Sequence, residues 1–237
     1  MSDRARAPWK AGLIGGLVGA VLTAVLLIAI LPQWLGPRIV REGLMRDPEA
    51  LVAASDALKA KQASAAIGPI RAALETPFAS SWKGAAKPTA TMTYFYDYAC
   101  GYCRKSNPDI ERLLAEDKGL RVVYRELPIL GPDSIAAARV ALAASRAGKF
   151  AAFHDALSEA GRPTPGAISR VANALALSPA DAQSSDVEAE IRKNMALAGQ
   201  LGATGTPLFV VGDTVINSAA GYDALKQAIA AARGRAG

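Results

Sequence analysis

The sequence predicts an α/β protein in which a membrane segment and a helical stalk precede one exported domain. Three observations support this prediction: an uncharged stretch at 11–31, helix signals over 32–75, and two strand-like segments around a helix at the start of 90–237. The expected order in the last region is βαβ, an all-helical insertion over about 133–202, and then ββα.

The composition excludes several classes of protein. Of 237 residues, 51% are hydrophobic and 20% are charged, and only 2 are cysteines. The chain is therefore too apolar to be disordered and too poor in cysteine to be a disulfide-stapled scaffold. The net charge is +6, and residues 1–42 contribute +3 of it through five basic and two acidic side chains. The remaining +3 is spread over the rest of the chain, so we expect no nucleic-acid partner.

Residues 11–31 have the length and composition of a transmembrane helix. A helix of this length spans about 31 Å, which matches the hydrocarbon core of a bilayer at about 30 Å. Trp9 and Trp34 flank the segment, where aromatic rings favour the headgroup region. Three basic residues precede it: Arg4, Arg6 and Lys10. Residues 1–10 should therefore be cytoplasmic, with the chain anchored in the inner membrane bilayer and the rest in the periplasm.

A cleaved secretory signal is the alternative interpretation of this segment. Such a signal has an apolar region of about 7–15 residues that ends in a small-x-small cleavage site. Here the apolar run is longer and ends in Ile30-Leu-Pro-Gln-Trp34, which contains no such site. An uncleaved signal anchor is therefore favoured. Both interpretations deliver the rest of the chain to an oxidising compartment.

A helical stalk is expected over residues 32–75. Asp47-Pro-Glu49 marks a helix start, because Asp is a good N-cap and Pro is tolerated at the first helical position. The helix should run to about Ala66, and a short one should follow near 70–74. Leucines recur every seven residues: Leu44, Leu51 and Leu58. Both a spacer helix on its own domain and a self-association helix fit this pattern. Residues 76–89 are interpreted as a linker.

The region 90–237 contains the elements of one domain. Residues 91–98 and 120–126 are rich in aromatic and β-branched residues, which favours strands, and 102–115 has helical spacing between them. These two strands should be parallel with a right-handed crossover. Four or five short helices fit 133–202. Residues 208–216 predict a hairpin that turns at Gly212-Asp213, and 222–232 predict a closing helix.

The chemistry of the chain is concentrated in Cys100-Gly101-Tyr102-Cys103, which lies where the first strand meets the first helix. A Cys-x-x-Cys beside a βαβ pattern indicates a redox-active pair. The free amides and the dipole at a helix N-terminus stabilise a thiolate, so the pKa of the Cys100 thiol should fall from about 8.5 toward about 3.5–7.5. Cys103 should be more buried and act as the resolving thiol.

Three other roles for the cysteine pair were weighed. A structural zinc site needs four ligands, and His154 is the only histidine. A purely structural disulfide would close a very small loop and remove little chain entropy. Idle buried thiols would be unusual in an exported protein. The redox-active pair is the favoured interpretation, and we expect no cofactor and no metal.

Four segments resemble the DsbA-type thioredoxin-fold oxidoreductases, and within them the ScsC-like branch (suppressor of copper sensitivity). These segments are Phe95–Cys103, Tyr124–Pro132, Phe153–Leu157 and Gly205–Phe209. The resemblance covers residues 90–237 and implies a thioredoxin fold with a helical insertion. Asp47-Pro-Glu49 is also similar to the oligomerising segment of that branch, which implies a homo-oligomer.

The resemblance also implies a second part of the site at Thr206-Pro207. In this fold the proline is cis and faces the active-site cysteines, and the residue before it binds the substrate backbone. Several relatives have a buried Glu six residues before the first cysteine, and this chain has Tyr94 there. Asp97 and Glu126 are the nearest acids along the chain, so the acid–base partner of Cys103 is left open. We expect His154 to be a packing residue, and Arg104 and Lys105 to belong to a solvated first turn.

The expected function is disulfide exchange with cysteine-containing exported proteins, including isomerisation or oxidation. A membrane or periplasmic electron-transfer partner should reset the cysteine pair. Because Gly-Tyr between the cysteines supplies no cation, we expect a redox potential of intermediate value. Two other functions are kept as alternatives: a module that handles Cu(I) through its two thiols without significant exchange, and a tethered interaction protein with a vestigial fold.

Overall fold

A computed structural model of the chain describes residues 24–25, 37 and 40–234. It divides into two compact units, Met1–Leu58 and Lys59–Gly237, which are considered separately. Nearly all of the predicted membrane segment, residues 11–31, lies outside the described residues. Among the residues that are described, no helix combines the length and the apolarity that a membrane span requires.

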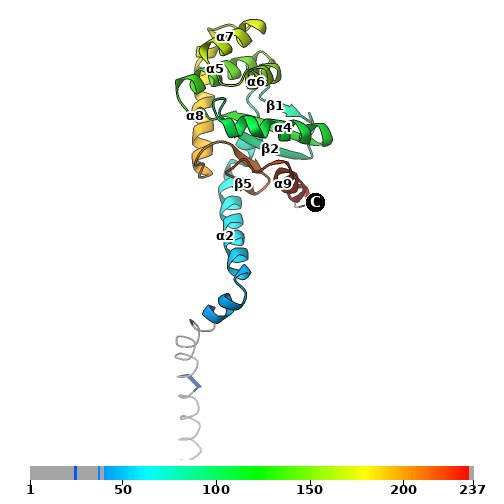
Figure 1. The fold of residues 1–237 in the computed structure, drawn as a ribbon, viewed down its shortest axis with the longest axis vertical. Helices are drawn as coiled ribbons and strands as arrows, with labels where there is room; N and C mark the ends of the chain where they lie inside the picture. The colour runs from blue at the N-terminus through cyan, green and yellow to red at the C-terminus, as the bar shows by residue number, and fades with distance from the viewer. Residues whose placement is uncertain (1–23, 26–36, 38–39, 235–237) are drawn as a thin grey trace, which may run out of the picture. The chain divides into compact units, whose positions relative to one another are not determined.

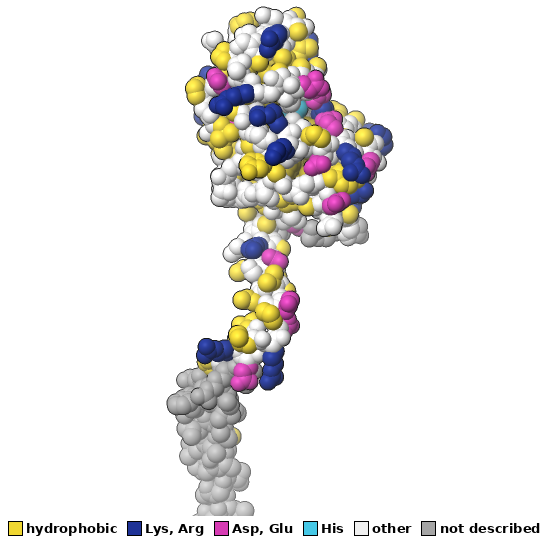
Figure 2. All heavy atoms as spheres, viewed as in Figure 1, with side chains coloured by type: hydrophobic (Ala, Val, Ile, Leu, Met, Phe, Trp, Pro, Cys, Tyr) yellow, Lys and Arg dark blue, Asp and Glu magenta, His cyan; other side chains and the backbone are white. Residues whose placement is uncertain are grey.

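The described part of the first unit is helical. Residues 40–46 form one helical stretch, and α2 (Glu49–Ile67) begins after Asp47 and Pro48. The amide of Ala50 donates a hydrogen bond to Asp47 Oδ1 at 3.3 Å, which confirms the predicted helix start. Hydrophobic side chains are exposed along α2 (Figure 2), and Leu51 and Leu58 have exposed fractions of 59% and 56%.

The second unit is built on a mixed five-stranded sheet with the order β1-β3-β2-β4-β5, of which β1, β2 and β5 are labelled in Figure 1. Its strands are β1 (Trp82–Gly84), β2 (Ala90–Tyr96), β3 (Leu120–Glu126), β4 (Leu208–Val211) and β5 (Thr214–Ile216). The β2–β3 pair is parallel, as predicted, and every other neighbouring pair is antiparallel. The predicted hairpin is also confirmed, because β4 and β5 are joined through Gly212 and Asp213.

One strand lies where the sequence predicted only a linker. Within residues 76–89, β1 pairs with β3 at the edge of the sheet. The preceding Ser81 is buried and donates its hydroxyl hydrogen to Ser145 at 2.9 Å. Gly84 has a φ of +96°, and a Cβ there would collide with the carbonyl oxygen of Leu120. Gly84 thus allows this short edge strand to approach β3 closely.

Helices cover both faces of the sheet. α4 (Gly101–Glu116) and α9 (Tyr222–Gly234) pack on one face, and α3 (Arg71–Glu75) and α8 (Ser185–Gln200) pack on the other. The predicted insertion consists of α5 (Pro132–Arg146), α6 (Phe150–Glu159), α7 (Pro165–Ala174), the 3₁₀ turn η2 (Asp181–Gln183) and α8. Figure 1 shows α5, α6 and α7 grouped together, with α8 leading back toward the sheet.

The strand residues alternate between two cores. Toward α4 and α9 they supply an aromatic core that includes Tyr94, Tyr96 and Phe209. Toward α3 and α8 they supply a second core that includes Phe95 and Leu208. Ile67 of α2 and Leu74 of α3 are buried in this second core. The last part of the predicted stalk, residues 59–75, is therefore part of the folded second unit.

A buried arginine fastens this segment to the sheet. Arg125 of β3 is 1% exposed, and its Nη1 donates to Glu190 Oε1 at 2.9 Å and to Asn194 Oδ1 at 2.8 Å. Its Nη2 donates to the carbonyl oxygens of Leu74 at 3.2 Å and Thr76 at 2.7 Å. One side chain thus joins β3, α8 and the segment that contains α3, because the guanidinium has five donors to distribute.

Candidate active site

The two cysteines lie at the start of α4, just beyond the end of β2. Cys100 is the N-cap of the helix, with an extended backbone (φ −75°, ψ 117°). Its sulfur accepts a hydrogen bond from the backbone amide of Cys103 at 3.4 Å. Both cysteines are unbridged and buried. Cys100 therefore occupies the position at which the free amides of a helix N-terminus can stabilise an anion.

The surroundings of Cys100 favour its thiolate. The pKa of Cys100 is lowered from its ordinary value of 9.0 to about 5. The hydrogen bond from the Cys103 side chain is the largest cause, and the Thr206 side chain and the backbone amides of Cys103 and Tyr102 act in the same direction. Burial opposes them. Near neutral pH this thiol is mostly ionised and thus nucleophilic.

The second thiol has the opposite character. Burial is the largest cause that raises the pKa of Cys103 far above its ordinary range, and the neighbouring Cys100 adds to it. Cys103 is 2% exposed, whereas Tyr102 beside it is 64% exposed. The helix thus presents one ionised thiol and holds a protonated thiol one turn further in.

The predicted Thr206–Pro207 pair faces Cys100. The peptide bond between the two residues is cis, as the resemblance implies. They lie in the loop that leads into β4, and the sulfur of Cys100 is 3.3 Å from the carbonyl oxygen of Thr206. Residues that are about a hundred positions apart in sequence are therefore brought together by the antiparallel pairing of β2 and β4.

The residues that flank the cysteines do not place a cation on the sulfur. Gly101 and Tyr102 form the exposed first turn of α4. Arg104 donates from its Nη1 to the carbonyl oxygen of Tyr98 at 3.0 Å, and Lys105 lies over the Tyr102 ring at 5.7 Å. The described hydrogen bonds of the Cys100 sulfur involve Cys103 and Thr206 instead.

Asp97 organises the loop that carries the cysteines, a role that the sequence did not reveal. Its side chain is buried, and Oδ1 accepts a hydrogen bond from the amide of Ala99 at 2.8 Å. Oδ2 accepts hydrogen bonds from the amides of Ile129 at 2.9 Å and Leu130 at 3.0 Å. The amide of Cys100 donates to the carbonyl oxygen of Asp97 at 3.0 Å. Asp97 thus joins the cysteine loop to the loop that follows β3.

A second buried polar group lies behind the site. The Tyr96 hydroxyl is 3.0 Å from Glu126 Oε1 and 3.1 Å from the Tyr98 hydroxyl, which is 3.3 Å from His154 Nδ1. Burial raises the pKa of Glu126 to about 8 and lowers the pKa of His154 to about 3. His154 packs against aromatic rings on α6 and the sheet, which agrees with its predicted packing role.

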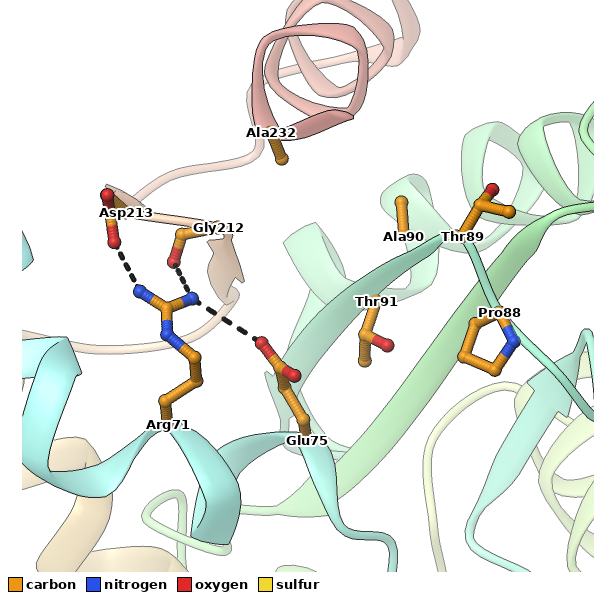
Figure 3. Close-up of a pocket in the computed structure, with 9 residues that line it drawn as sticks. All are labelled: Arg71, Glu75, Pro88, Thr89, Ala90, Thr91, Gly212, Asp213 and Ala232. Carbon is orange, nitrogen blue, oxygen red and sulfur yellow. Dashed lines mark hydrogen bonds and ion pairs between the residues drawn. The ribbon is translucent and has the colours of Figure 1, made fainter. Parts of the chain in front are cut away.

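A cavity of about 470 Å³ lies at the opposite end of β2 from the cysteines (Figure 3). Arg71 crosses it and donates to the carbonyl oxygen of Gly212 at 3.0 Å, and it also pairs with Asp213 and Glu75. Arg71 is thus paired with both carboxylates of the lining. Within the residues that the structure describes, no three His, Cys, Asp or Glu side chains are grouped as possible metal ligands.

The fold and the site together define the class of the protein. A mixed sheet, a helix that begins at a Cys-x-x-Cys pair and a cis-proline facing that pair are the features of a thioredoxin-fold oxidoreductase. The chain belongs to the DSBA-like thioredoxin domain family, whose model matches residues 91–230.

Solved structures support this assignment. A periplasmic thioredoxin-like protein from Salmonella enterica serovar Typhimurium is 30% identical, with a TM-score of 0.64, and the match covers 70% of this chain and 96% of that one. A thioredoxin-like oxidoreductase from Silicibacter pomeroyi is 38% identical, with a TM-score of 0.62 and coverage of 65% and 91%. Proteus mirabilis ScsC in a transitional conformation is 25% identical, with a TM-score of 0.65 and coverage of 86% and 97%. The resemblance to the DsbA type and its ScsC-like branch is confirmed.

A shorter match links the chain to a different kind of protein. Over 77 residues it is 32% identical to the Na(+)/H(+) antiporter NhaA 3 of Salinispora tropica. This match covers 32% of the chain but only 12% of the antiporter, so the chain spans a small part of that curated relative.

Proposed function

We propose that this protein is a membrane-anchored, periplasmic enzyme that exchanges disulfides with exported proteins through Cys100 and Cys103. The observation that carries the proposal is the placement of the two sulfurs. Cys100 is the N-cap of α4 and accepts the Cys103 amide at 3.4 Å, and Cys103 is 2% exposed. The Cys100 thiol, with a pKa of about 5, is ionised near neutral pH, whereas the pKa of Cys103 is raised far above its ordinary range. Thiolates attack disulfides and thiols do not, so the two cysteines have distinct roles.

In the first step the Cys100 thiolate attacks a disulfide of the substrate. A new S–S bond forms between Cys100 and one substrate sulfur, and the other substrate sulfur leaves as a thiolate. Thr206 is placed to contact the substrate, because its backbone carbonyl is a hydrogen-bond acceptor that lies 3.3 Å from the Cys100 sulfur. An extended substrate segment would pair with the backbone of this loop.

In the second step Cys103 loses its proton and attacks the Cys100 sulfur. The Cys100–Cys103 disulfide forms, the mixed disulfide breaks, and the substrate leaves with a reduced sulfur. Run in reverse, the same two steps transfer the disulfide to a substrate and oxidise it. If the substrate instead resolves the mixed disulfide with another of its own cysteines, the result is isomerisation.

The acidity of Cys100 sets the direction of exchange. Each pKa unit below ambient pH stabilises the reduced pair by about 1.4 kcal/mol, or about 30 mV for a two-electron couple. A pKa of about 5 therefore makes the pair roughly 60 mV more oxidising than one with a pKa near 7. This supports the intermediate potential that the Gly101-Tyr102 dipeptide predicts, and it suits both isomerisation and oxidation.

Two features support the proposed location. Residues 11–31 have the apolarity and length for an inner-membrane anchor, with basic residues on the side expected to be cytoplasmic. A similar protein from Salmonella enterica is described as periplasmic.

The exposed apolar side chains on α2, including Leu51 and Leu58, support self-association through the stalk. An electron-transfer partner in the membrane or periplasm would reset the pair.

The full chain in detergent tests the proposal, with a scrambled-disulfide substrate whose refolding restores a measurable activity. We expect Cys100→Ser to abolish exchange, and Cys103→Ser to accumulate a mixed disulfide that survives denaturation and disappears with reductant. The matched control is Ser106→Ala, which changes a neighbouring position of α4 without a thiol. Undiminished exchange by Cys100→Ser would refute the proposal.

A further inference from the structure

The resolving step requires that buried Cys103 become a thiolate, and neither of the two nearest acids along the chain is hydrogen-bonded to it. The Asp97 carboxylate accepts three backbone hydrogen bonds, from the amides of Ala99, Ile129 and Leu130. The Glu126 carboxyl accepts a hydrogen bond from the Tyr96 hydroxyl through Oε1, and its Oε2 is buried without a hydrogen-bond partner. Neither carboxyl is hydrogen-bonded to Cys103 in the described structure.

Four polar groups interact with the Cys103 thiol: Cys100, Thr206, the backbone of Asp97 and the hydroxyl of Tyr94, which also reaches the Cys103 carbonyl oxygen at 3.2 Å. Cys100 and Thr206 belong to the face that binds the substrate, and the Asp97 amide is fixed by its loop. Tyr94 approaches from the sheet, beneath the first turn of α4. The position of the Tyr94 hydroxyl therefore does not depend on whether a substrate is bound beside Cys100 and Thr206.

The ring of Tyr94 is rigidly held, but its hydroxyl is not tightly bound. The ring is fully buried and stacks on Phe209 at 4.8 Å and on Tyr96 at 5.2 Å. The hydroxyl donates to the carbonyl oxygen of Cys103 at 3.2 Å and lies 3.4 Å from Asn107 Oδ1. Both distances are long for an O–H···O bond, which is usually about 2.7–2.8 Å. The proton is thus available to a stronger acceptor beside it, such as a thiolate.

A polar route leads from this hydroxyl to solvent. Asn107 also lines an open cleft of about 410 Å³ between α4 and α6, together with Arg104, Glu111, Asp155 and Ser158. The Nδ2 group of Asn107 donates to the Ser158 hydroxyl at 3.2 Å. A cleft of this size and polarity holds water, because a water molecule needs two to four polar partners. Water there can accept a proton released near Tyr94.

We propose that the Tyr94 hydroxyl donates a hydrogen bond to the Cys103 thiolate during resolution, while the thiol proton leaves to water in the Asn107 cleft. The inference rests on the proposed function and assigns the partner of Cys103 that the sequence left open. The S–H bond of Cys103 breaks, the Cys100–Cys103 bond forms, and the bond from Cys100 to the substrate breaks. The substrate sulfur leaves with the electron pair and takes a proton from solvent. In the reverse direction the same contact stabilises Cys103 as it leaves.

The test separates the two thiol steps in one trace. The reduced full chain is mixed with an equimolar amount of dithionitrobenzoate, an aromatic disulfide that releases a coloured thiolate in each step. Attack by Cys100 gives the first phase, and resolution by Cys103 gives the second. The titratable groups that act most on the Tyr94 hydroxyl are Cys103 in α4, Tyr124 on β3 and Cys100 at the N-cap of α4. Tyr124→Phe is therefore the matched control, since it removes a buried hydroxyl from the adjacent strand.

We expect Tyr94→Phe to leave the first phase close to the wild-type rate and to slow the second about tenfold or more, because the Cys103 thiolate loses a charge-assisted hydrogen bond. The second phase should also need a higher pH to reach the same rate, because the thiolate has lost a donor. Tyr124→Phe should change neither phase. Tyr94→Met provides a second apolar replacement if Tyr94→Phe is poorly folded.

Three results would contradict either the role of Tyr94 or the proposed function. If Tyr94→Phe and Tyr94→Met both show a second phase at the wild-type rate, the role of Tyr94 is overturned and the proposed function is unaffected. Equal slowing by Tyr124→Phe would show that the effect is structural and would also overturn the role of Tyr94. A wild-type protein that releases no second thiolate would instead contradict the proposed function.

Discussion

The backbone amide of Cys103 donates a hydrogen bond to the sulfur of Cys100 at 3.4 Å. This bond exists because Cys100 is the N-cap of α4 and Cys103 is in its first turn, where amides have no acceptor inside the helix. The same turn leaves Cys100 beside the substrate face and places Cys103 within the aromatic core. One local backbone geometry thus separates the acidities of two chemically identical side chains.

The first prediction concerns the contribution of Cys103 to the acidity of Cys100. Wild-type alkylation should rise with pH around a midpoint of about 5, because the thiolate is the reactive form. Cys103→Ala should move that midpoint upward, since the Cys103 side chain is the largest cause of the low pKa of Cys100. The rate of iodoacetamide modification as a function of pH measures both values.

Cys103→Ser is the control for this prediction, because a hydroxyl retains a donor beside the Cys100 sulfur. Its midpoint should lie between those of the wild type and Cys103→Ala. A midpoint that is the same in all three proteins would show that the backbone amides alone set the acidity.

A second prediction follows for stability and pH. The pKa of Cys100 in the folded protein, about 5, is below its ordinary value of 9.0, so its thiolate stabilises the reduced form fully above pH 9 and progressively less as pH falls through 5. The raised pKa of Cys103 contributes stability that is lost only above about pH 9. The Tm of the reduced protein minus that of the oxidised protein should therefore decrease between pH 9 and pH 5.

Taking the difference between the two redox forms cancels other titrating groups, such as Glu126 and His154. The double variant Cys100→Ala/Cys103→Ala should show no effect of reductant on Tm at any pH. A reduced-minus-oxidised difference that is constant over this range would contradict the assignment of the ionised thiol.

The third prediction tests the loop anchor. Asp97→Ala removes a buried carboxylate that accepts three amide hydrogen bonds, and it leaves the amides of Ile129 and Leu130 without partners. Hydrogen bonds to a charged group contribute about 1.5–3 kcal/mol, so we expect a loss of at least about 2–3 kcal/mol in the free energy of unfolding. Urea denaturation measures it. Asp223→Ala, which changes an exposed aspartate, should stay within about 0.5 kcal/mol.

Local sequence signals predicted most elements of the catalytic domain and the position of both cysteines. The predicted strand 120–126 coincides with β3, which is mostly buried. The predicted helix 102–115 lies within α4, whose hydrophobic periodicity reflects its one buried face. The Gly212-Asp213 turn was also correct, since its φ of +57° at Gly212 is one that glycine adopts readily. These features depend on neighbours in the sequence.

The features that the sequence did not reveal depend on contacts between distant segments. β1 is three residues long and is specified by its pairing with β3 rather than by a pattern of its own. No sequence motif marks Asp97. Two of the three amides that its carboxylate binds, those of Ile129 and Leu130, belong to a distant loop that only the fold brings close. Tyr94 could be aligned with a catalytic position, but its approach to Cys103 requires the packing of α4 on the sheet.

The final prediction addresses the buried Arg125, which explains why residues 59–75 belong to the catalytic unit. Arg125→Met should cost about 3–5 kcal/mol in the free energy of unfolding, because it leaves Glu190 buried without its main partner and removes the donor to the carbonyl oxygens of Leu74 and Thr76. Limited proteolysis should then cut within 59–75 while the wild type resists.

The matched control for Arg125 is Arg139→Met, which breaks the half-exposed pair with Glu188 and should cost no more than about 1 kcal/mol. The double variant Arg125→Met/Glu190→Met should recover part of the stability, since no buried charge is then left unpaired. Its segment 59–75 should still be cut, because the carbonyl oxygens of Leu74 and Thr76 still lack their donor. Equal losses for Arg125→Met and Arg139→Met, with 59–75 resistant in both, would show that apolar packing of Ile67 and Leu74 alone holds the segment in place.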